Sequence, residues 1–187
     1  MLGYTQDVLQ TYAAAPEAQR DYRAKDRALV ALGSLNKVLL NSKKYKGSLE
    51  TLIVQHVLPE FQSPVGFMRY RACWMVQRFA QVDFQDPNTI QQCLNCTLQC
   101  LRDSALPVQI EAASSLRYLI ELDETEDPVL KVLPDILNEY FRIMKEIGLD
   151  EVVSALDLII EKYQNYIAPH ASALTQQLTR CFLEYAS

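Results

Sequence analysis

The stretch from Phe67 to Phe79, FMRYRACWMVQRF, decides the fold of this chain. Its apolar residues follow the 3.6-residue spacing of one helix face, with small Ala72 and Cys73 set among Met68, Val76 and Phe79. Basic residues occupy the opposite flank. The spacing predicts an amphipathic helix that presses its apolar face against a neighbour.

The same register recurs along the chain at intervals of about 40 to 47 residues, which identifies an internal repeat. Three copies match closely and the last more loosely. The copies are Ala24, Ala28, Leu32 and Leu35; Met68, Ala72, Val76 and Phe79; Val108, Ala112, Leu116 and Leu119; and Leu149, Val152, Leu156 and Ile159.

Each period has room for two antiparallel helices, which favours HEAT units over armadillo units because the latter need a third helix. We therefore predict one all-α domain over residues 1–187, an α-α superhelix of right-handed HEAT type with about four helix pairs and a leading half-repeat. The first helix has no upstream partner, so we expect the chain to be a fragment of a longer solenoid. The expected units are 1–15, 16–62, 63–103, 104–147 and 148–187.

Prolines, glycines and apolar periodicity predict where the helices begin and end. Asp86 and Asp127 each precede a proline and are expected to cap the helices that follow, while Gly148 is the expected stop of a long helix. Pro59 and Pro134 recur in the same Val-Leu-Pro context and predict a first-turn position or a tolerated bend. The expected helices cover 3–14, 17–41, 48–61, 67–81, 87–102, 106–122, 128–147, 149–163 and 167–185.

Charge is distributed unevenly along the chain. The net charge is −5, yet residues 1–72 hold ten Lys or Arg and six Asp or Glu, whereas residues 73–187 hold eight and seventeen. An acidic second half argues against nucleic acid and favours basic protein partners. No signal-peptide pattern opens the chain, and five cysteines without framework spacing indicate free thiols in a reducing compartment.

Residues suited to catalysis or metal binding are sparse. His56 and His170 are the only histidines, and no phosphate-loop, dinucleotide or zinc-protease motif occurs, so we predict no enzyme and no cofactor. Cys93, Cys96 and Cys100 share one helix face without a nearby fourth ligand, and we interpret them as core residues. Trp74 is expected to pack against the neighbouring repeat.

The acidic stretch from Glu121 to Glu151 is the best candidate for a partner-binding surface, because acids facing a basic ligand steer encounter and select partners. The predicted core face of the helix there consists of the apolar residues Val129, Val132, Leu133, Ile136, Tyr140, Ile143 and Ile147. From the acids of this stretch we predict six partner-binding residues, three before the helix and three along it: Asp123, Glu124, Glu126, Asp135, Glu139 and Glu146.

Several segments resemble a known family. GFMRYRACW, at 66–74, resembles the middle of an importin-beta superfamily receptor of the importin-seven or importin-eight type. Further matching segments are Lys25-Asp26-Arg27-Ala28, Gly33-Ser34-Leu35, Val57-Leu58-Pro59, Leu106-Pro107-Val108 and Glu111-Ala112-Ala113. The likeness is strongest over residues 25 to 120, and beyond about Leu122 only the helix pattern matches.

This resemblance implies a karyopherin segment that binds cargo and carries it through nuclear pores under control of the Ran GTPase, shuttling between cytoplasm and nucleus. The expected cargoes are basic proteins of the histone or ribosomal-protein type, with Ran and nucleoporins bound through the full-length parent. Neither membrane insertion nor direct nucleic-acid binding is expected. The alternative is a HEAT scaffold subunit of an enzyme or signalling complex.

Overall fold

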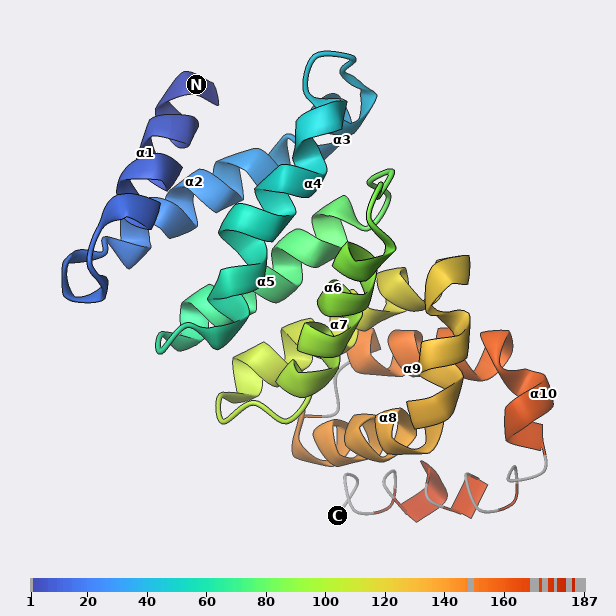
Figure 1. Ribbon diagram of the computed structural model, residues 1–187. Helices are drawn as coiled ribbons and strands as arrows, with labels where there is room; N and C mark the ends of the chain where they lie inside the picture. Colours follow the sequence, from blue (N-terminus) through green and yellow to red (C-terminus); the bar gives the residue numbers. More distant parts are fainter. Residues whose placement is uncertain are drawn as a thin grey trace.

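The computed structural model describes residues 2–147, 150–168, 172, 175, 176, 178–180 and 183. It confirms the predicted fold class, since the described elements are helices stacked as a HEAT-like solenoid (Figure 1). The α-helices are α1 (Leu2–Ala14), α2 (Tyr22–Ser34), α3 (Asn36–Asn41), α4 (Leu49–Leu52), α5 (Gly66–Phe79), α6 (Pro87–Cys100), α7 (Leu106–Ile120), α8 (Glu126–Ile147), α9 (Asp150–Lys162) and α10 (Gln164–Ile167).

The solenoid is built on a row of four helices in which α2 contacts α5, α5 contacts α7, and α7 contacts α9. Small residues lie where these helices meet: Ala28, Ala72, Ala112 and Ala155 are all almost completely buried. Alanine at such positions lets neighbouring helices approach closely enough for the larger apolar side chains to interlock. Three of these alanines, Ala28, Ala72 and Ala112, occupy the register read from the sequence, whereas Ala155 lies one position before Leu156 of the fourth copy.

A second row consists of the helical segment 49–62 with α6 and α8 (Figure 1). The segment 49–62 packs against α5, α6 packs against α5 and α7, and α8 packs against α7 and α9. Hydrogen bonds from buried hydroxyls reinforce the packing. Ser115 Oγ of α7 donates to the Cys73 carbonyl of α5 over 2.9 Å, and Tyr140 Oη of α8 donates to the Ala113 carbonyl of α7 over 2.6 Å. Of the apolar stripe predicted for α8, Val129, Leu133, Ile136, Tyr140 and Ile143 are buried, whereas Val132 is only half-buried.

The long helix expected over 17–41 is wrong. A 3-10 turn spans Glu17–Gln19, α2 begins only after Asp21, whose carboxylate accepts from the Ala24 amide over 2.9 Å, and the helix breaks at Leu35. Side-chain bonds to α5 accompany this break: Asn36 Nδ2 donates to the Arg78 carbonyl over 2.9 Å, and Arg78 Nη2 donates to Asn36 Oδ1 over 3.1 Å. Tertiary hydrogen bonds thus favour a bend that apolar spacing does not reveal.

The segment expected as one helix over 48–61 is helical but changes type along its length. After α4 comes a π-helical turn at Ile53–Val57 and then a 3-10 turn at Leu58–Gln62. Pro59 explains part of this change, because it has no amide proton to donate and its ring crowds the carbonyl four residues earlier. Pro134, in contrast, lies inside α8 without ending it.

Of the two expected aspartate caps, one is confirmed and one is wrong. Asp86 Oδ1 accepts from the Asn88 amide over 2.9 Å and caps α6, with Pro87 in the first turn. Asp127 lies within the first turn of α8, which begins at Glu126. A 3-10 turn at Asp123–Thr125 leads directly into α8, so the helix begins upstream of the expected cap.

Gly148, Leu149, His170 and most of the expected helix 167–185 lie outside the described residues. The division of the chain into units remains a prediction, as does its origin as a fragment.

A buried ion pair joins the first helices to the helical segment 49–62. Lys25 Nζ of α2 lies 2.6 Å from Glu60 Oε1, and both side chains are almost inaccessible to solvent. Tyr12 of α1 donates its hydroxyl to Glu60 Oε2 over 3.3 Å, and its ring lies 4.2 Å from Lys25 Nζ. Burial lowers the pKa of Lys25, while the bond to Glu60 opposes that shift.

Trp74 packs against α2, as the sequence predicted, and its indole covers Gly33. The guanidinium groups of Arg71 and Arg78 lie 4.7 Å and 5.5 Å from its ring centroid. A Cβ atom at position 33 would overlap the indole, so glycine is required there by close approach of the ring. This contact fixes the spacing between α2 and α5.

We expect Gly33→Ala to lower the free energy of unfolding by about 2 kcal/mol, because the added methyl group forces the indole out of its packed position. Urea unfolding followed by circular dichroism measures the change. Gly47→Ala is the matched control, since a Cβ there meets nothing within 4 Å. If Trp74→Leu did not reduce the cost of Gly33→Ala in the double variant, the proposed contact would not be its cause.

Candidate functional site

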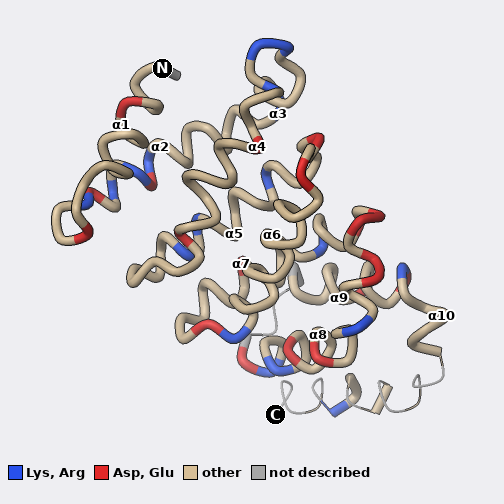
Figure 2. The backbone as a smooth tube through the Cα atoms, viewed as in Figure 1, with Lys and Arg blue, Asp and Glu red and all other residues tan. Residues whose placement is uncertain are grey.

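The six predicted partner-binding acids lie around the beginning of α8 and along it. Asp123 and Glu124 belong to the 3-10 turn before α8, and Glu126 is the first residue of that helix. Figure 2 shows acidic positions gathered at this turn and both signs of charge along α8. Asp123, Glu124, Glu126, Asp135 and Glu146 are exposed, whereas Glu139 is half-buried.

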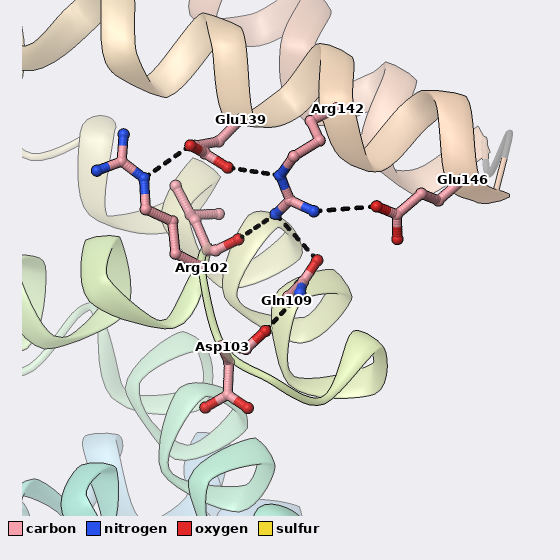
Figure 3. A network of polar contacts seen from close by, with 7 residues as sticks. Arg102, Asp103, Gln109, Glu139, Arg142 and Glu146 are labelled. Carbon is pink, nitrogen blue, oxygen red and sulfur yellow. Dashed lines mark hydrogen bonds and ion pairs between the residues drawn. The ribbon is translucent and has the colours of Figure 1, made fainter.

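Glu139 and Glu146 are engaged in internal ion pairs (Figure 3). Arg102 Nε and Arg142 Nε donate to the two carboxylate oxygens of Glu139 over 2.7 Å and 2.8 Å. Arg142 Nη1 also reaches Glu146 Oε1 over 3.1 Å. These two acids are therefore largely neutralised within the chain, and Glu139 ties α8 to the end of α6.

Arg142 extends the network toward the preceding repeat. Its Nη2 donates to the Leu101 carbonyl over 2.8 Å and to Gln109 Oε1 over 3.0 Å. The amide nitrogen of Gln109 donates in turn to the Asp103 carbonyl (Figure 3). The Arg142 guanidinium thus donates a hydrogen bond to the Leu101 carbonyl, just after α6, and orients the Gln109 side chain of α7.

Asp103 carries the network back to α5 through a bidentate pair. Arg69 Nε and Nη2 donate to its two carboxylate oxygens over 2.6 Å and 2.8 Å, and Arg69 Nη1 donates to the Ser63 carbonyl over 2.9 Å. Asp103 Oδ1 also accepts from the Ala105 amide over 2.8 Å. Hydrogen bonds therefore run without interruption from α5, through the 101–105 turn and α7, to α8.

The electrostatic balance of the two carboxylates follows from these contacts. Burial raises the pKa of Glu139, but the hydrogen bonds from Arg142 and Arg102 outweigh burial and hold that pKa below its ordinary value. The bond from Arg69 is the largest effect on Asp103 and lowers its pKa. Both groups are ionised at neutral pH and stabilise the folded chain in that form.

A groove of about 300 Å³ opens between α6 and α8, beside this network. Leu98, Leu101, Val132 and Ile136 form its apolar wall, and Asp135 stands at its edge with Glu139. In the described part of the chain Asp135 forms no ion pair within 4 Å, although its negative charge acts on Arg102, which also lines the groove. The groove can hold the aliphatic stem of a Lys or Arg side chain with its charged end at Asp135.

The sequence analysis named Asp135 and Glu139 as candidates but missed Arg102, Asp103 and Gln109, which belong to the network beside them. Arg102 and Asp103 are adjacent in the turn after α6, and only the fold brings Arg102 to Glu139, thirty-seven positions away. An arginine and an aspartate at the end of a helix were the one local signal available. Their partners cannot be identified from spacing along one helix.

The four cysteines that the structure describes lie on helix faces and have free thiols. Cys93 and Cys100 are buried and Cys96 is half-buried, and burial raises the pKa of the Cys93 thiol to about 12. Within the described ranges no group of three or more His, Cys, Asp or Glu side chains is placed to hold a metal ion. No helix of the described part is long and apolar enough to cross a membrane.

Comparisons with known proteins find importins. The chain is similar to an importin beta-like SAD2 homolog of Arabidopsis thaliana, with 36% identity over 94% of this chain and 17% of that protein. A probable importin-7 homolog of Dictyostelium discoideum is 33% identical over 98% of this chain and 17% of that protein. Importin-8 of Homo sapiens is 30% identical over 91% of this chain and 17% of that protein.

The chain spans about one sixth of the length of these relatives. No family model and no solved structure matches it.

We expect Asp103→Asn to lower the free energy of unfolding at pH 7 by about 1–2 kcal/mol, because the variant keeps the Ala105 bond but removes the charge facing Arg69. Because folding lowers the pKa of Asp103, its carboxylate stabilises the folded chain at pH values above the ordinary pKa of 3.8. That stabilisation is lost as the pH falls through the pKa of the folded state. Urea unfolding of the two proteins at pH 7 and near pH 3 should therefore show their difference shrinking.

Asp83→Asn provides the control, since Asp83 and Lys46 form an exposed pair 3.6 Å apart and should contribute nothing measurable. An Asp103→Asn deficit that stayed constant with pH would contradict the assignment.

Proposed function

Since this chain is a segment of the importin-beta type, we propose that it forms part of a nuclear import receptor and that its α6–α8 groove helps to bind basic cargo proteins. The observation that carries the proposal is Asp135, an exposed acid without an internal ion pair at the edge of an apolar groove. A cargo Lys or Arg would lay its methylene stem on the groove wall and place its charge beside the carboxylate.

The Arg102–Glu139–Arg142 network supports this role by fixing the groove. Arg142 joins α8 to the turn that follows α6, so the two walls are held at a set separation. A preorganised groove loses little entropy when a side chain enters it. The neutralised pair Glu139 and Arg142 therefore positions the groove, while Asp135 recognises the cargo.

The exposed acids before α8 extend the same surface. Asp123, Glu124 and Glu126 would attract basic cargo at longer range, and their effect would act mainly on the association rate and fall with rising salt. Cargo of the histone or ribosomal-protein type fits this charge pattern.

The remaining steps of transport belong to the full-length parent. We propose that it binds Ran and nucleoporins through other repeats, shuttles between cytoplasm and nucleus, and catalyses no reaction. Because each repeat contacts only its neighbours, small rotations at successive joints would add up to a change in curvature that releases cargo.

Charge reversal at Asp135 tests the groove. We expect Asp135→Lys to weaken binding of a fluorescent Lys/Arg-rich peptide by about three- to tenfold in fluorescence anisotropy, with a smaller effect at high salt. Asp157→Lys on α9 changes net charge equally on an exposed residue of the other row and should have a much smaller effect. Equal losses in both variants would show that only net charge matters.

Glu139 is unsuitable for this test, because its substitution would also leave Arg102 and Arg142 unpaired. The transport role is tested separately with the full-length parent. GTP-loaded Ran should release bound basic cargo, and retention of cargo in the presence of Ran would argue against an import receptor.

A further inference from the structure

A second groove, of about 510 Å³, lies at the opposite end of the solenoid from α8. It runs between α1 and the helical segment that begins with α4. Leu32 of α2 and Leu39 of α3 also line it. Leu9, Leu32, Leu39 and Leu49 give it a largely apolar floor. The groove is larger than the one at Asp135 and shares no residue with it.

The shape of this groove matches a helix. On α1 its lining extends from Thr5 to Ala14, and on the other wall from Ser48 to His56. At about 1.5 Å per residue these walls are about 12–14 Å long, which corresponds to about two and a half helical turns. Both walls are helical and run in the same direction (Figure 1). A helix laid between them would present apolar residues at i, i+3 or i+4, and i+7 to the floor.

The charges at the groove specify the character of that helix. None of the residues that line it is charged, and its rim carries amides and hydroxyls such as Gln6, Gln10 and Thr51. One end is bordered by the loop after α3, which is basic in Figure 2 and contains exposed Lys43 and Lys44. Lys44 Nζ lies 5.1 Å from the ring centroid of Tyr45, which itself lines the groove.

Lys43 and Lys44 have no acidic partner within 4 Å among the described residues, in contrast to Lys46, which lies 3.6 Å from Asp83. An acidic ligand would supply the negative charges that Lys43 and Lys44 lack nearby. The other end of the groove holds His56, whose buried Nδ1 has no hydrogen-bond partner in the described structure. A buried polar atom without a partner calls for a water or ligand group.

We propose that the groove between α1 and the α4 segment receives an amphipathic helix of a partner protein, with aliphatic residues on the floor and acidic residues at the Lys43–Lys44 end. This partner differs in charge from the basic cargo assigned to the Asp135 groove, so one chain would hold two partners of opposite character.

The test uses a fluorescein-labelled helical peptide of about 14 residues with leucines at the i, i+3, i+7 and i+11 positions and glutamates in its first turn. A matched peptide carries lysines in place of the glutamates. Fluorescence anisotropy with the intact chain should show the acidic peptide binding at least about tenfold more tightly than the basic one. Lys43→Glu combined with Lys44→Glu should reverse this preference.

Gln10→Trp fills the groove and should weaken binding of the acidic peptide by at least about tenfold. Thr11→Trp, on the next residue of the same helix and outside the groove, should leave binding unchanged and controls for the stability of α1. Asp135→Lys should also leave it unchanged, which separates this groove from the proposed cargo site.

No binding of the acidic peptide at about 1 mM would overturn the proposal, as would binding insensitive to Gln10→Trp or equal affinity for the two peptides. Occupation of the groove by the apolar dye 1-anilinonaphthalene-8-sulfonate without its displacement by the peptide would indicate a small-molecule site and would also overturn it.

Discussion

The close approach of α2, α5, α7 and α9 along buried alanines is the constraint on which the rest of the structure depends. Ala28, Ala72, Ala112 and Ala155 leave room for helices to meet, and Gly33 does the same for the indole of Trp74. Once this row is packed, each connecting turn must return the chain to the same side, and the second row follows. The apolar core is therefore continuous from α1 to α10 although each helix pair contacts only its neighbours.

Polar contacts determine how rigid that stack is and where it can bind. The hydrogen-bonded path from Arg69 through Asp103 and Gln109 to Arg142 links two successive repeats near the end of α6. It also neutralises two of the acids on α8, since Glu139 and Glu146 form ion pairs with arginines of the same chain. Asp135 stands apart because it lies beside the network without joining it. Of the six predicted acids, Glu139 and Glu146 are thus engaged within the chain, while Asp123, Glu124, Glu126 and Asp135 are exposed.

The sequence was sufficient for the fold class, the register of the four matching helices and the Asp86 cap, because apolar spacing and capping are local properties. It failed at Leu35, where Asn36 bonds to Arg78 on another helix, and at Asp127, which lies inside a helix that begins earlier. It named Asp135 and Glu139 as candidates but not Arg102, Asp103 or Gln109, whose hydrogen-bond partners lie on other helices. Neither groove could be predicted, because a groove depends on how far apart two helices settle.

The buried pair of Lys25 and Glu60 constrains how this joint can evolve. Losing either partner alone leaves a charge without compensation in the interior, at a cost of about 3–5 kcal/mol, whereas replacing both by apolar residues of similar volume is often neutral or stabilising. The path between those two sequences passes through an intermediate that few marginally stable proteins tolerate. Lys25, Glu60 and the tyrosine hydroxyl bonded to Glu60 should consequently be inherited as a unit, and exchanged as a unit when they change.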